Sequence, residues 1–120
     1  MFRDKIMEFP IYRGMLCIID TDERDKISEK YKIDLEDELF AFTLEHYVDT
    51  EIKDCYCIFV ILNTANPSKV TTGIIAHEAF HAANFLLNRR GHKFSYDNDE
   101  AHAYLVEWIA EEVQKFLDTK

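Results

Sequence analysis

The apolar run from Cys55 to Leu62, CYCIFVIL, is the feature that most constrains the fold of this chain. A strand with one face in water alternates apolar and polar residues, whereas this run is apolar on both faces. Such a strand has to be covered on two sides. The run therefore predicts a central strand with other elements packed above and below it.

Two shorter segments before this run predict further strands. Residues 11–19 resemble a strand with Gly14 as a weak point, and residues 39–48 alternate apolar and polar side chains like a half-buried strand. Between them, residues 21–31 predict a short exposed helix, and residues 34–38 predict a loop or turn. We therefore expect a small, mostly antiparallel sheet.

Two long helical patterns follow the turn at residues 63–68. The first is expected to begin at residue 71 or 72 and to stop at Gly91, because glycine favours the conformation that ends a helix. The second is expected over residues 97–117, with an apolar stripe facing the core. The order predicts a single α+β domain over residues 1–120, with both helices packed on the sheet.

Composition excludes several classes of function. The chain has 14 Lys and Arg against 23 Asp and Glu, and its net charge is −9. This charge repels phosphate backbones, so nucleic-acid binding is not expected. No stretch approaches the roughly 20 apolar residues of a membrane span, and the charged N-terminal segment does not resemble a signal peptide. With an odd count of three cysteines, a cytoplasmic protein with reduced thiols is expected.

The segment His77-Glu78-Ala79-Phe80-His81 carries the most informative chemistry. Helical residues four apart lie on the same face, so both imidazoles can bind one metal ion. Glu78 lies about 100° around the helix from His77 and can reach a water on that metal without being a ligand. Zinc lowers the pKa of such a water to about 7, and a carboxylate can then accept its proton. The alternative is two surface histidines on an amphipathic helix.

A catalytic zinc ion also needs a third protein ligand and an open position. Glu100, His102 and His92 are the downstream candidates. Glu100 and His102 are about 200° apart on a helix, so they cannot both face the same metal. Glu100 has a second interpretation, because Asp97 and Glu100 have the spacing of a helix capping box. His102 falls on the apolar side of its helix, where a buried role is expected.

The histidine motif at residues 77–81, followed by Glu100-Ala-His-Ala, resembles the gluzincin branch of zinc metallopeptidases, the thermolysin-like group. The resemblance covers about residues 70 to 118 and is nearest to the minimal, single-domain members. It implies a zincin-like fold, in which the sheet packs on an active-site helix and a second long helix. It also implies that an edge strand aligns the substrate backbone, and residues 39–48 are our candidate.

The resemblance implies a role for each matching residue. His77, His81 and Glu100 would be the zinc ligands, and Glu78 would be the general base. Tyr104 stands where the family has an aspartate that supports the ligands. Its phenol is expected to orient a ligand or to stabilise the oxyanion.

Two of these assignments have rivals. SprT-like zinc proteases use a third histidine in a short Gly/His segment after the helix, which makes His92 the rival of Glu100. Tyr96 and His102 are the rivals of Tyr104 as oxyanion donors.

The expected function is zinc-dependent hydrolysis of a peptide bond in a peptide or protein substrate. Zinc would polarise the carbonyl, and Glu78 would pass the proton of the attacking water to the leaving amine. One alternative is a non-catalytic zincin-fold protein, in which zinc is structural or the domain is a binding module. The length of 120 residues favours this alternative, and the intact Glu78 disfavours it. Another is a metal-free helix–sheet domain whose histidine spacing is coincidental.

Overall fold

The computed structural model describes residues 1–33, 41–49, 54–65 and 70–119. These residues form, in order, β1 (Phe2–Glu8), β2 (Met15–Thr21), α1 (Arg24–Tyr31), β3 (Ala41–Asp49), β4 (Asp54–Leu62), α2 (Thr72–Arg89) and α3 (Glu100–Asp118). The predicted α+β class is confirmed. The loop predicted at residues 34–38 and part of the turn predicted at 63–68 lie outside the described residues.

The strands form one mixed sheet with the order β1-β2-β4-β3. β1 pairs antiparallel with β2, and β3 pairs antiparallel with β4, whereas β2 and β4 are parallel. Two of the three strand pairs are thus antiparallel, as predicted, and the parallel central pair makes the sheet mixed. Two parallel neighbours need a connection that crosses back along the sheet, and the chain through α1 and β3 provides it.

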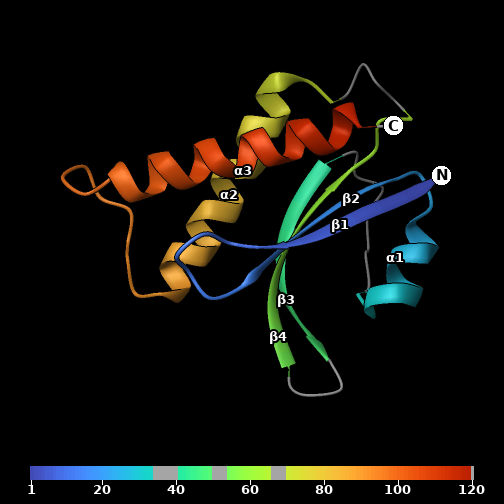
Figure 1. Ribbon diagram of the computed structural model, residues 1–120, viewed down its shortest axis with the longest axis horizontal. Coiled ribbons are helices and arrows are strands. Elements are labelled where there is room, and N and C mark those ends of the chain that lie inside the picture. The colour runs from blue at the N-terminus through green and yellow to red at the C-terminus, as the bar shows by residue number, and fades with distance from the viewer. Residues whose placement is uncertain (34–40, 50–53, 66–69, 120) are drawn as a thin grey trace.

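Helices cover both faces of the sheet, which gives three layers (Figure 1). α2 and α3 pack on one face, and α1 packs on the other. Successive residues of β4 point to alternate faces, so Ile58 and Val60 lie under α2 and α3, whereas Cys57 and Phe59 lie under α1. These four side chains are all buried. The central strand predicted from the apolar run is confirmed.

β1 was missed by the sequence pattern, and β2 begins later than predicted. β1 lies at the end of the sheet order and carries charged, partly exposed residues that hide the strand pattern. The predicted strand over residues 11–19 is a turn followed by β2, because Ile11 and Gly14 have positive φ values of 72° and 144°. Such conformations are typical of turns, and here they reverse the chain between β1 and β2.

α2 begins and ends where the local signals predict. The side chain of Thr71 accepts a hydrogen bond from the Ile74 backbone N–H at 3.2 Å. Gly91 follows the helix with a φ of 81°, which glycine adopts without strain. The direction of its histidines follows from packing, because the apolar face of α2 is buried in the core and leaves His77 and His81 exposed.

α3 begins three residues later than predicted. The Asn98 backbone N–H donates to the Ser95 carbonyl at 3.2 Å, in a turn that precedes the helix. Glu100 is the first helical residue, so Asp97 and Glu100 do not form the predicted capping box. Within the described part of the chain, no helix is both long and apolar enough to cross a membrane.

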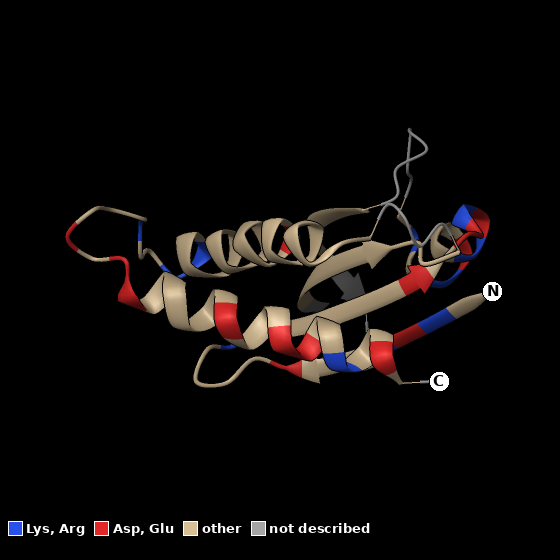
Figure 2. Cartoon of the chain, turned by 90° about the horizontal axis from the view of Figure 1, so that it is seen from above, with Lys and Arg blue, Asp and Glu red and all other residues tan. Residues whose placement is uncertain are grey.

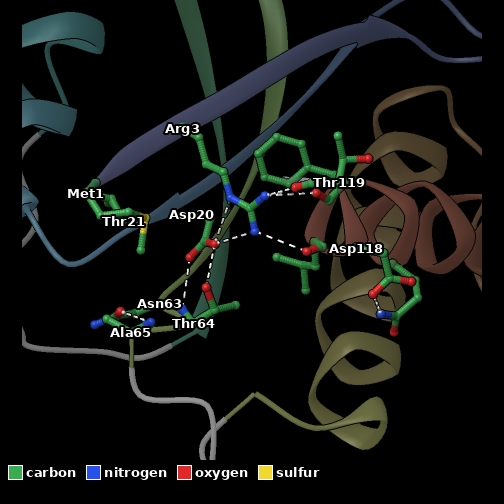
Figure 3. A network of polar contacts seen from close by, with 12 residues as sticks. Met1, Arg3, Asp20, Thr21, Asn63, Thr64, Ala65, Asp118 and Thr119 are labelled. Atoms are coloured by element: carbon green, nitrogen blue, oxygen red, sulfur yellow. Dashed lines mark hydrogen bonds and ion pairs between the residues drawn. The ribbon is translucent and has the colours of Figure 1, made fainter.

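An ion pair between the partly exposed Arg3 and the buried Asp20 joins the two ends of the described chain (Figure 3). Asp20 is fully buried and accepts hydrogen bonds from Arg3 Nε at 3.0 Å and Nη2 at 2.9 Å. It also accepts from the Thr64 backbone N–H at 2.9 Å and from its hydroxyl at 2.6 Å. Arg3 donates further to the carbonyls of Phe116 and Thr119 at the end of α3. The network thus connects β1, β2, the residues after β4 and α3.

We predict that Arg3→Met destabilises the fold by about 3 kcal/mol, because it leaves the buried Asp20 carboxylate without its cation. Urea denaturation measures the change in the free energy of unfolding. The matched control is Lys26→Met, which removes an ion pair with Glu23 between two exposed side chains and is expected to have little effect. Equal losses in the two variants would show that the network adds nothing beyond a surface pair.

Candidate metal centre

His77 and His81 lie on the exposed face of α2, one helical turn apart. Their Nε2 atoms are 3.1 Å apart, and the ring centroids are separated by 4.7 Å. Two nitrogen ligands of a tetrahedral zinc ion, each about 2.0–2.1 Å from it, lie about 3.3 Å from one another. The two imidazoles are therefore spaced to bind one ion. The same contact can be an N–H···N hydrogen bond when one Nε2 carries a proton.

Glu78 is buried beside this pair, with an exposed fraction of 5%. Its Oε2 is 3.9 Å from His77 Nε2. Its Oε1 accepts a hydrogen bond of 2.7 Å from the hydroxyl of Thr43, which lies on β3. The carboxylate is thus held between the strand at the end of the sheet and the histidine pair.

The contact with Thr43 was missed by sequence reasoning. The polar residues of β3 were interpreted as the solvent side of a half-buried strand, but this face lies under α2. Ala41 of β3 packs on the core beneath α2 and α3, whereas Phe42 and Leu44 pack on the α1 side. The only available signal was the polar Thr43 at an alternate position, which does not identify its partner.

Glu100 is not gathered with the histidine pair. It is exposed at the start of α3, and this end of the helix lies away from the point where α2 and α3 cross (Figure 1). Among the described residues, no three or more His, Cys, Asp or Glu side chains are grouped so that they could hold a metal ion. The structure therefore places two of the three predicted ligands and the predicted base together, and the third ligand stays a prediction.

The rival residues lie around the segment between α2 and α3. His102 is buried, as predicted, and its ring centroid is 5.4 Å from that of His92 and 5.0 Å from that of Phe94. Burial lowers the pKa of His102, and the neighbouring His92 lowers it further. Tyr104 and Tyr96 are exposed to 67% and 95%. A donor role for either phenol stays a prediction.

Most of the charged residues of α3 are acidic (Figure 2). The helix contains five acidic residues and one lysine. With a net charge of −9 on the chain, the resulting electrostatic field attracts cations.

Comparison with known proteins found no match. No protein-family model, no curated protein and no solved structure is significantly similar to this chain. The interpretation of the site therefore depends on the geometry of α2 and β3 and on the chemistry of their side chains.

Proposed function

We propose that this chain is a zinc-dependent metallopeptidase of the gluzincin type, with a zincin-like fold. The observation that carries the proposal is the 3.1 Å separation of His77 Nε2 and His81 Nε2, with the Glu78 carboxylate beside them. The donor set suits zinc, because imidazole nitrogen and carboxylate oxygen are among its usual ligands. Glu100 lies apart from the pair in this structure, and it is proposed as the third ligand on the resemblance of its sequence position to the gluzincin motif.

The presence of Glu78 favours a catalytic role over a structural one. Zinc at this site would act as a Lewis acid that polarises the peptide carbonyl and lowers the pKa of water. Glu78 then accepts a proton from the attacking water at one carboxylate oxygen and donates it to the leaving amine as the C–N bond breaks. A structural site has no need of this buried carboxylate.

β3 is the proposed platform for the substrate. It lies at the end of the sheet order and pairs with β4, as expected for the edge strand predicted at residues 39–48. An extended peptide can add to such an edge through main-chain hydrogen bonds, which makes binding largely independent of side chains. The hydrogen bond between Thr43 and Glu78 supports this proposal, because it joins β3 to α2. A peptide or protein substrate is therefore proposed.

Tyr104 is proposed to support the reaction from α3. It follows Glu100 by one helical turn, so the two side chains point to similar sides of the helix. A phenol there can orient the ligand or donate a hydrogen bond to the developing oxyanion.

We predict that the purified protein contains one zinc ion per chain and cleaves casein or a mixed peptide library. Removal of zinc with a chelator should abolish cleavage, and added zinc should restore it. Zinc should also raise the melting temperature, because it binds only the folded chain. Zinc binding without cleavage would instead support a non-catalytic zincin-fold protein. A protein that binds no zinc would support the alternative of a metal-free domain.

The third ligand can be identified by comparing Glu100→Gln with His92→Ala. We expect Glu100→Gln to weaken zinc binding by at least about tenfold, because the neutral amide of glutamine is a poor zinc ligand. Glutamine has nearly the same size as glutamate, so the change tests the ligand atom alone. His92→Ala should bind zinc like the wild type. Competition with a chromogenic chelator measures both affinities. The reverse result would replace the gluzincin arrangement by the SprT-like one.

A further inference from the structure

Thr43 reaches the candidate site from a strand that is 35 residues away in sequence. Its Oγ1 is 2.7 Å from Glu78 Oε1 and 3.2 Å from the main-chain oxygen of the same residue. A hydroxyl has one proton, and the shorter, charge-assisted contact is the stronger hydrogen bond. The Thr43 hydroxyl therefore donates its hydrogen bond chiefly to the Glu78 carboxylate.

We propose that Thr43 is a positioning residue that determines which oxygen of Glu78 acts as the base. This inference rests on the proposed peptidase function. Thr43 turns Oε1 toward β3, which leaves Oε2 on the side of the histidine pair, 3.9 Å from His77 Nε2. Oε2 is then the oxygen that faces the attacking water.

The hydrogen bond is compatible with both protonation states that the reaction requires. When Glu78 accepts a proton, an O–H bond of water breaks and an Oε2–H bond forms, while the water oxygen bonds to the carbonyl carbon. Oε1 still has a lone pair for the Thr43 hydroxyl. The Oε2–H bond then breaks as the leaving nitrogen gains the proton and the C–N bond is cleaved. Thr43 can hold the carboxylate in one orientation throughout this cycle.

Loss of the hydroxyl would leave a buried carboxylate oxygen without its donor. Such a group is costly, so the side chain would rotate toward water to recover hydrogen bonds. A displacement of about 1 Å in a catalytic group can cost about 100-fold in rate. The Thr43 side chain faces α2 and contacts the base, so its loss should affect the chemical step rather than substrate binding.

The test compares Thr43→Val, Thr43→Ser and Thr72→Val in the zinc-loaded full chain. Thr43→Val should lower kcat by about 10- to 100-fold and leave KM and zinc content unchanged. Thr43→Ser keeps the hydroxyl and should restore most of kcat. Thr72→Val is the matched control, because it makes the same substitution at an exposed residue at the start of α2, and it should behave like the wild type.

The outcomes separate this role from the proposed function. If the wild type cleaves peptides and Thr43→Val has the same kcat, the positioning role alone is overturned. The role is also overturned if kcat falls as far in Thr43→Ser as in Thr43→Val. An inactive wild type would overturn the function and the role together. A measurement without activity tests the contact itself: Thr43→Val should lower the melting temperature more in the wild type than in Glu78→Ala. Equal shifts in both backgrounds would also overturn the role.

Discussion

A His81→Ala variant is expected to purify without zinc under conditions in which the wild type keeps one equivalent. The substitution removes one of the two imidazoles whose Nε2 atoms are 3.1 Å apart. Removing only the hydrogen-bond partner of a metal ligand costs about 10- to 100-fold in affinity, and removing the ligand should cost more. Metal analysis after dialysis against a weak chelator measures the loss.

The control for this variant is Asn88→Ala, a substitution at an exposed residue further along the same helix. It changes the helix without touching the histidine pair and should keep the zinc of the wild type. If His81→Ala and Asn88→Ala contain equal amounts of zinc, the histidine pair is not the metal site, and the N–H···N hydrogen bond explains its geometry.

The second large effect is expected for Glu78→Gln, which should reduce kcat by about 100- to 10,000-fold. Glutamine has nearly the same shape and can still accept the Thr43 hydrogen bond, but it does not accept a proton at this step. Zinc content should therefore be unchanged while cleavage is lost. Steady-state kinetics on a peptide substrate, with zinc measured in the same sample, gives both quantities.

Glu107→Gln is the matched control for Glu78→Gln, because it changes the same residue type at an exposed position on α3. It should leave both kcat and zinc content unaltered. A Glu78→Gln variant as active as this control would exclude Glu78 as the general base and require another group to accept the proton.

Features that depend only on residues close together in the sequence could be predicted from it. β4 was identified because its apolar run needs cover on both faces wherever it lies. α2 was identified through the cap at Thr71 and the stop at Gly91, both of which are local signals. The closeness of His77 and His81 is also local, since any regular helix brings residues four apart onto one face.

Features that depend on tertiary packing were not predictable. β1 is a strand because β2 pairs with it, and its charged residues conceal the pattern. The parallel pairing of β2 with β4 depends on how the connection crosses the sheet. The Thr43–Glu78 contact requires α2 to lie over one particular face of β3, and neither segment encodes that docking by itself.

The Arg3 network also has a consequence for the order of folding. Its hydrogen bond to the Phe116 carbonyl joins residues 113 positions apart, which makes it one of the most non-local contacts this chain can form. Closing a loop of that length carries an entropic cost, which favours the formation of more local contacts first. The hydrogen bonds from Arg3 to α3 therefore require α3 to be packed, whereas the pairing of β1 with β2 is local and does not depend on it.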